Sequence, residues 1–547
     1  MNFDNYTTLN FNLTRHLDTG PSGPQLLEGP EGPGLVFDWR EVHSPEGPYG
    51  EAEGWLTEAR VSPAGAAPGL ALVFGLGLGY HLKLIRQKYP GIRLVVYEPI
   101  PELAEVYAQN GVMTPADGPA PLIFTDWRAF EKTAGQEIVY GARRGVMVVA
   151  PEPYKALRPE AFGAFDLYAG QEIIRRAVIE RTRENNDAAF LKNLAQNAGR
   201  LMELPDLLVL KGRLPARPAF LVGSGPSLDK NVDQLRQIGP RGLIMAPAST
   251  LKPLLNHGVR PDVVLVLESE DTSDYLKLNP AERETLGTRT VLALASGCHP
   301  AHFQVEGFHQ AVYHLTAGEA QIFSNGPFLP QGGNSGSAVF ALAYLWGLSP
   351  LVLVAQDQAY DHGRLHAAGT PGTVVESAPE TIAVRGVADE VVETNTGLLA
   401  SLGWFAEAAR TIAGQPSPPP LYNCSASGAR ISGFKEVPLS AVTASLAPVN
   451  GPLDLAGILP RLPRPVRKEV EGDVSQLLGL VNSLRKLARM DYRKGYAEVK
   501  EAGQLSKFLG QVLAEAAVAN GRSELWAALE RADGLLTVMM SSLLSRD

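Results

Sequence analysis

The sequence contains little cysteine. Cys298 and Cys424 are the only two thiols among 547 residues. Two cysteines cannot form a disulfide framework or a cysteine-rich zinc site, because both need more thiols. This composition favours a reducing compartment, and we expect a cytoplasmic protein.

The chain also lacks an excess of positive charge. Its 49 Lys and Arg residues are outnumbered by 58 Asp and Glu residues, which gives a formal net charge of -9. Broad nucleic-acid binding needs a basic surface, so nucleic acid is not an expected partner. Met1–Tyr6 lacks the basic start and apolar stretch of a signal peptide, and no run of about 18 apolar residues could span a bilayer.

Hydrophobic residues make up 45% of the chain, as in a typical globular protein. The length predicts roughly three domains of about 150 residues each. Proline-rich stretches at 415–420 and 459–467 mark breaks in the pattern. The expected parts are an N-terminal cap with a Rossmann-like domain (1–165), a helical connector (166–212), a central catalytic domain (213–440) and a C-terminal helical domain (455–547).

Short apolar runs alternate with helical stretches in two parts of the chain, which is typical of parallel α/β sheets. The expected strands include 70–74, 94–98, 121–124, 146–149, 219–222, 243–245, 263–267, 291–294 and 351–354. We therefore predict an α/β fold with two Rossmann-like parallel-sheet domains, followed by an all-α C-terminal domain.

Gly75–Gly79 follows the first of these strands, and Glu98 ends the next one nineteen residues beyond Gly79. This order occurs in dinucleotide and S-adenosylmethionine sites. It also occurs in Rossmann-like units that serve only for packing. No substrate site is evident nearby, so both interpretations stay open.

A second glycine turn follows the strand at 219–222. Glycines at this place let the backbone approach a ligand closely. Ser227 is expected to cap the next helix and to leave free amides for a phosphate. The predicted nucleotide-binding residues of this turn are Gly223, Ser224, Gly225, Pro226 and Ser227.

A third glycine-rich turn precedes the helix that runs through Trp346. Two such turns can hold one nucleotide, although each can also be a simple helix cap. The predicted nucleotide-binding residues here are Gly333, Asn334, Ser335 and Gly336.

The strand at 351–354 runs into a dense polar segment that ends at His366. Packing does not explain so many polar residues at the carboxyl end of a buried strand. Asp357 could orient a substrate hydroxyl or cap a turn, whereas Tyr360 and His366 could stabilise a departing phosphate. Gln356 and Arg364 are predicted to bind substrate.

Acidic residues follow the strand at 263–267. Glu268 and Asp271 could hold a magnesium ion or face solvent, because a divalent site usually combines carboxylates with substrate phosphates. Glu268 is predicted to contact substrate. No resident metal is predicted, although Mg²⁺ remains possible.

The three glycine turns and the polar segment that ends at His366 resemble those of the motility-associated factor (Maf) proteins, which glycosylate flagellin and whose central domain is related to archaeal pterin pyrophosphokinase-like proteins. The match also includes His43 with Glu51 and a closing segment at 422–433. The central domain further resembles bacterial sialyltransferases that bind a cytidine monophosphate (CMP) sugar donor. This resemblance implies a sialyltransferase-like fold and transfer of a nonulosonic or ulosonic acid, such as pseudaminic acid, legionaminic acid or Kdo, to Ser or Thr of flagellin.

The chain departs from the sialyltransferase pattern at three places. Ser224 replaces an asparagine that contacts the nucleotide, and His366 stands where a second tyrosine would stabilise the leaving phosphate. The segment from Asp389 to Thr396 has no histidine base. An acid such as Glu393 could serve as the base instead, or the acceptor could be activated differently.

The sequence leaves three further functions open. One is a pyrophosphokinase of the 6-hydroxymethyl-dihydropterin type that uses ATP and magnesium. Another is a non-catalytic chaperone that binds flagellin. The last is a methyltransferase that uses Gly75–Gly79.

Overall fold

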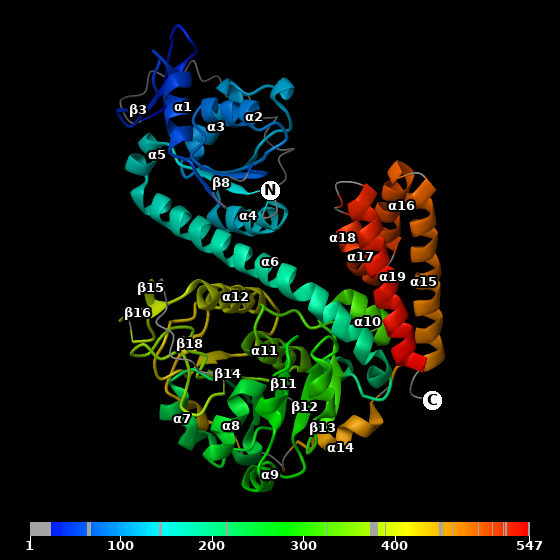
Figure 1. The fold of residues 1–547 in the computed structure, drawn as a ribbon. Coiled ribbons are helices and arrows are strands. Elements are labelled where there is room, and N and C mark those ends of the chain that lie inside the picture. The colour runs from blue at the N-terminus through cyan, green and yellow to red at the C-terminus, as the bar shows by residue number, and fades with distance from the viewer. Residues whose placement is uncertain are drawn as a thin grey trace. The chain divides into compact units, whose positions relative to one another are not determined.

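The computed structural model describes residues 23–544 except 63–66, 142–144, 215–216, 325, 372–380, 389, 448–450, 452, 463, 491, 506, 518 and 520–521. The chain forms two compact units, Met1–Glu180 and Arg181–Asp547 (Figure 1). The helix α6 (Pro159–Leu201) begins in the first unit and ends in the second.

The first unit is built on a five-stranded sheet in the order β4-β8-β5-β6-β7, parallel except for β4. Its strands are β4 (Arg60–Ser62), β5 (Leu70–Phe74), β6 (Arg93–Tyr97), β7 (Leu122–Phe124) and β8 (Val146–Val149). Its other elements are β1 (Gln25–Leu27), β2 (Gly34–Phe37), β3 (Arg40–His43), α1 (Pro48–Thr57), α2 (Tyr80–Lys88), α3 (Pro101–Asn110), α4 (Trp127–Gly141) and α5 (Glu152–Leu157).

The second unit contains an eight-stranded parallel sheet in the order β13-β12-β11-β10-β9-β14-β17-β18. Its strands are β9 (Ala219–Val222), β10 (Leu243–Pro247), β11 (Val263–Val266), β12 (Val291–Ala295), β13 (His309–Tyr313), β14 (Leu351–Val354), β17 (Leu421–Asn423) and β18 (Lys435–Glu436). A separate antiparallel hairpin pairs β15 (Ile382–Arg385) with β16 (Val391–Thr394).

Helices cover both faces of this sheet, as a parallel sheet requires. Along β9, Ala219 and Leu221 pack in the same core as α11, whereas Phe220 and Val222 pack in the core formed with α7. The helices of this part are α7 (Leu228–Leu235), α8 (Ala248–Asn256), α9 (Pro280–Leu286), α10 (Ala317–Phe323), α11 (Ser335–Trp346), α12 (Thr396–Ala413), α13 (Leu439–Ala444) and α14 (Leu455–Ile458).

The second unit ends in a group of helices. They are α15 (Arg467–Met490), α16 (Tyr492–Leu505), α17 (Lys507–Val512), α18 (Ala514–Ala517) and α19 (Arg522–Leu544). Leu477, Val481 and Leu484 of α15 are buried at helical spacing, and this stripe belongs to the core of the unit. The predicted fold class, two parallel-sheet parts followed by helices, is confirmed. No helix in the described residues is long and apolar enough to cross a membrane.

Candidate functional site

The strand order of the second unit reverses at one strand, β9. From β9 the chain proceeds outward through β10, β11, β12 and β13, and then returns to the other side of β9 as β14. In open α/β sheets, ligands bind at such a reversal, beyond the carboxyl ends of the strands. Gly223 follows β9 and Gln356 follows β14, so both predicted segments meet at this point.

The glycines after β9 are needed because the end of β14 lies against them. A Cβ atom on Gly223 would lie 2.5 Å from the carbonyl oxygen of Ala355, and one on Gly225 would lie 2.7 Å from the same oxygen. The amides of Gly223 and Gly225 donate to Val354 and Ala355 at 2.8 and 3.0 Å. These two hydrogen bonds therefore join the glycine turn to the end of β14.

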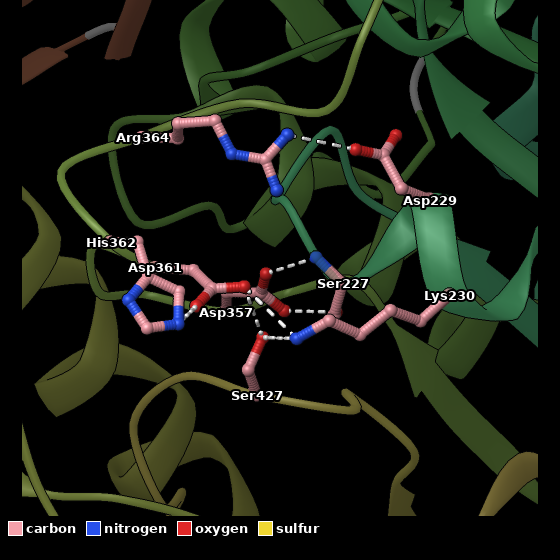
Figure 2. A network of polar contacts seen from close by, with 8 residues as sticks. All are labelled: Ser227, Asp229, Lys230, Asp357, Asp361, His362, Arg364 and Ser427. Atoms are coloured by element: carbon pink, nitrogen blue, oxygen red, sulfur yellow. Dashed lines mark hydrogen bonds and ion pairs between the residues drawn. The ribbon is translucent and has the colours of Figure 1, made fainter.

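Ser227 stands at the N-cap position of α7, as expected, but its side chain makes no capping hydrogen bond to the helix. Its hydroxyl donates to the carboxylate of Asp357, and its amide donates to the other carboxylate oxygen at 2.7 Å (Figure 2). Asp357 itself is buried, and burial raises its pKa to about 6 even though the bonds from Ser227 lower it. Asp357 thus caps the turn, which is the second of the two roles the sequence allowed.

Ser224 and His366 lie together at the outer side of this turn. The Ser224 hydroxyl is 3.1 Å from Nδ1 of His366, and the Ala367 amide donates to the Ser224 carbonyl at 2.8 Å. Both side chains are partly exposed, and burial lowers the pKa of His366. Burial therefore favours the neutral form of the His366 imidazole, which solvent can reach. Among the described residues, nothing accepts a hydrogen bond from the Ser224 amide.

The third glycine turn forms the amino end of α11. Asn334 caps this helix, since its Oδ1 accepts from the Ser337 amide at 2.8 Å. Gly333 is exposed at φ 86°, where a glycine is favoured. Ser335 donates its hydroxyl to Glu268 at 2.5 Å, so a predicted site residue at the start of α11 contacts one that follows β11. Within the described chain, the Ser335 and Gly336 amides have no acceptor, as is usual in a first helical turn.

Gln356 lies between the two glycine turns. A Cβ atom on Gly336 would be 2.7 Å from its Oε1, and one on Gly223 would be 2.9 Å from its Cδ. Its Nε2 is buried without a hydrogen-bond partner in the described structure, as is Oε1 of Gln358. Gln358 also has a φ of 50°, a strained value for a residue with a side chain. Unpaired buried groups and strain both concentrate at functional sites.

Tyr360 and Glu393 form a third group. The Tyr360 amide donates to the Glu393 carbonyl at 2.7 Å, and Asn395 donates to the Tyr360 hydroxyl at 2.8 Å. The Glu393 side chain is exposed on β16 and accepts from Thr381 at 3.2 Å. Asp389 of the same segment lies outside the described residues.

Arg364 lies on the exposed side of the loop, where it pairs with Asp229 at 3.1 Å (Figure 2). Lys230 pairs with Asp361 at 3.0 Å, and its Nζ is 3.4 Å from the Ser427 hydroxyl. These pairs connect the start of α7 with the loop after β14. These pairs could not be predicted from the sequence, because their partners are more than 100 positions apart in the chain.

In the described residues, no three His, Cys, Asp or Glu side chains come together in a metal-binding arrangement. Asp271 is exposed and accepts from the Ser273 amide at 3.0 Å, while Glu268 faces Ser335 and the Leu267 amide. Glu268 and Asp271 therefore contact different groups, and within the described part of the chain their carboxylates do not form a shared metal site.

The glycine turn of the first unit is closed by its own side chains. Leu76 donates its amide to Glu98 at 2.8 Å, and Gly77 donates to the Tyr154 hydroxyl at 2.8 Å. Burial raises the pKa of Glu98 to about 7, although bonds from Tyr154, Leu76 and Ile100 lower it. The ring of Tyr154 fills the place beside Gly75. This arrangement favours the packing interpretation of Gly75–Gly79 over a cofactor site.

Comparisons with known proteins agree with this fold. Residues 188–363 match a family model described as 6-hydroxymethylpterin diphosphokinase MptE-like. The structure is similar to that of the Maf glycosyltransferase from Magnetospirillum magneticum AMB-1, with a TM-score of 0.53 and 15% identity over 97% of this chain and 92% of that chain. No curated protein sequence matches the chain. The predicted resemblance is confirmed as a match of residues 188–363 to the MptE-like family model and as a fold similar to that of a Maf glycosyltransferase.

Proposed function

We propose that this protein is a glycosyltransferase that moves a nonulosonic or ulosonic acid from its CMP conjugate to Ser or Thr hydroxyls of flagellin. The observation that carries the proposal is the meeting of two glycine turns on Gln356 at the strand-order reversal. Similarity in fold to a Maf glycosyltransferase supports the same reaction class. Two free, buried thiols favour a reducing compartment, consistent with the cytoplasm.

In the proposed reaction, the acceptor hydroxyl oxygen attacks the anomeric carbon of the sugar. The bond from that carbon to the phosphate oxygen breaks, and CMP leaves with the electron pair. The amides of Ser224, Ser335 and Gly336 face the phosphate, where backbone donors at a helix start stabilise negative charge. A neutral His366 that accepts the Ser224 hydroxyl at Nδ1 carries its proton on Nε2, from which it donates to the leaving phosphate.

The remaining residues divide the other tasks. Glu393 is exposed beside Tyr360 and takes the acceptor proton as general base. Tyr360 adds a hydroxyl near the leaving group, Gln356 contacts the nucleotide, and Glu268 contacts the sugar. Asp357 holds Ser227 and so keeps the first turn in place. No step in this scheme requires a metal ion.

A second candidate function rests on the MptE-like match over 188–363. An enzyme of that class would transfer pyrophosphate from ATP to a hydroxymethylpterin and would need magnesium. Glu268 and Asp271 would then bind the metal, but in the structure they make separate contacts. We therefore rank this function below sugar transfer.

The two candidates separate in one experiment. Purified protein is incubated with flagellin and a panel of CMP-activated nonulosonic acids and CMP-Kdo, and the flagellin mass is measured intact. The proposed function predicts a mass increase by one or more sugar residues with at least one donor. No increase with any donor, together with magnesium-dependent pyrophosphate transfer from ATP to 6-hydroxymethylpterin, would establish the second function instead.

A further inference from the structure

Two asparagines of α6 contact the strand ends beside the candidate site. Asn193 and Asn197 are one helical turn apart, so they lie on the same face of α6. Both are buried. Neither was among the site residues expected from the sequence.

Each asparagine donates two hydrogen bonds to backbone carbonyls. Asn193 Nδ2 contacts the carbonyl oxygens of Ser269 at 2.8 Å and Gly297 at 3.3 Å. Asn197 Nδ2 contacts those of Ser296 at 3.0 Å and Cys298 at 2.8 Å. The four acceptors belong to the loops after β11 and β12. All four are carbonyls, so the amide nitrogen of each asparagine must face them.

These carbonyls lie beyond the ends of the strands, where the sheet no longer supplies donors. A buried carbonyl without a hydrogen-bond partner is unfavourable, and the asparagines supply the donors that the sheet does not. The loop and the helix are also in close contact. A Cβ atom on Gly297 would lie 2.9 Å from the carbonyl oxygen of Phe190 in α6.

The bonded loops determine where Glu268 lies. Ser269 is its direct neighbour, and the His299 amide donates to the Glu268 carbonyl at 3.0 Å. The Glu268 carboxylate in turn accepts from Ser335 at the start of α11. A shift in the loop after either β11 or β12 would therefore move this carboxylate relative to the helix.

The C-terminal helices hold the same segment of α6 from another side. The Ser542 hydroxyl of α19 accepts from the Gly199 amide at 3.1 Å and donates to the Gln196 carbonyl at 2.7 Å. Both contacts lie within one turn of Asn197. The asparagine-bearing turn is thus fixed between the strand-end loops and α19.

We infer that Asn193 and Asn197 are positioning residues that place Glu268 against the amino end of α11. This inference rests on the proposed function for its consequence in catalysis. The carbonyl contacts themselves do not depend on that function. We predict that the two asparagines affect sugar transfer through Glu268 and that their substitution leaves CMP binding nearly unchanged.

The test uses the full chain with Asn193→Asp, Asn197→Asp and, as a control, Asn256→Asp on the exposed end of α8. Aspartate keeps the shape of asparagine but removes both donors. Turnover of the CMP-sugar should fall roughly 10- to 100-fold for N193D, as expected for a small displacement of a site residue, and CMP affinity should stay within about twofold. N256D should match the wild type in both.

A double-mutant cycle with Glu268→Gln tests the route of the effect. If Asn193 acts through Glu268, N193D should reduce turnover little further in an E268Q background. Independent, multiplicative losses would overturn the inference, as would a loss of CMP affinity equal to the loss of turnover.

Hydrogen exchange of the ligand-free protein tests the positioning role even if no turnover is observed. N193D should speed exchange in peptides that cover 268–271 and 296–299, while N256D should not. If the wild type shows neither CMP binding nor sugar transfer, the proposed function fails, and faster exchange at these loops still supports the positioning role. Unchanged exchange there would overturn it.

Discussion

Gly75–Gly79 in the first unit and Gly223–Ser227 in the second occupy the same topological position. Each turn follows a central parallel strand at the point where the strand order reverses. In the first unit, Gly75–Gly79 is entirely buried. The Glu98 carboxylate and the Tyr154 hydroxyl each accept a hydrogen bond from a backbone amide of this turn. In the second, Ser224 and Gly225 remain partly exposed, with His366 beside them.

A buried carboxylate accepts hydrogen bonds from each turn, but side chains fill the first turn more completely than the second. Glu98 accepts hydrogen bonds from two amides and from Tyr154, so the whole reversal point is filled. Asp357 accepts from Ser227 alone among the residues of its turn and leaves the outer part open. A glycine turn at a reversal therefore indicates a possible site, and the side chains that meet it decide whether a ligand can enter.

The largest expected effect comes from opening the closed turn. Glu98→Ala should lower the free energy of unfolding by roughly 3–6 kcal/mol, because three buried donors lose their acceptor. Chemical denaturation would measure this loss. Glu98→Gln, which keeps one acceptor oxygen, should lose less. CMP affinity of protein that remains folded should not change, and a change there would mean that the first turn is also part of the nucleotide site.

The carboxylate of the second turn should show itself in the pH dependence of stability. Since burial raises the pKa of Asp357 to about 6 from its ordinary 3.8, the folded protein holds this proton more firmly than the unfolded chain. Its contribution is complete below about pH 4 and is lost as the pH rises through about 6, by on the order of 2–3 kcal/mol.

Asp357→Asn should remove this contribution to the pH dependence of the free energy of unfolding. Denaturation of both proteins between pH 4 and 8 would show the difference, and parallel curves would contradict the assignment. Glu98→Gln provides a comparison from the first unit, with a transition expected near pH 7 instead.

Gly336→Ala tests the close approach at the open turn. The new Cβ would lie 2.7 Å from Gln356 Oε1, so Gln356 must shift. We expect a loss of about 1–3 kcal/mol in stability and about a tenfold weaker CMP affinity by calorimetry. Gly472→Ala is the matched control, because nothing lies within 4 Å of its Cβ position in α15. It should bind CMP like the wild type, and equal affinities for both variants would place the nucleotide elsewhere.

The smallest effect on stability should come from Arg364→Ala. Its pair with Asp229 is exposed, and such pairs contribute below about 1 kcal/mol. If Arg364 binds the sugar carboxylate, the KM for the donor should still rise several-fold. Lys277→Ala removes a similar exposed pair with Asp274 away from the site and should change neither quantity. An unchanged KM for R364A would remove Arg364 from the substrate site.

The sequence predicted the parts of the site that depend on local patterns. The apolar runs at 219–222 and 351–354 became β9 and β14, and their polar ends meet because parallel strands end at one edge. Gly336 was expected at a helix start, where it lies. These features need only neighbouring residues to define them.

Contacts between distant segments could not be predicted in this way. Ser227 looked like a helix cap, but its partner Asp357 is 130 positions further along the chain. Asn193 and Asn197 lie in a polar helix where nothing in the sequence distinguishes them from surface residues. The β15–β16 hairpin was also missed, because its exposed strands lack a strong apolar pattern.

The position of β9 between β10 and β14 has a consequence for folding. Residues 219–313 can form five adjacent strands, but one edge of β9 has no partner until Leu351–Val354 has been synthesised. A nascent chain that has reached β13 therefore exposes the unpaired backbone groups along one edge of an apolar strand, which favours association with other chains. We expect this stage to be the one at which the growing polypeptide depends most on chaperones.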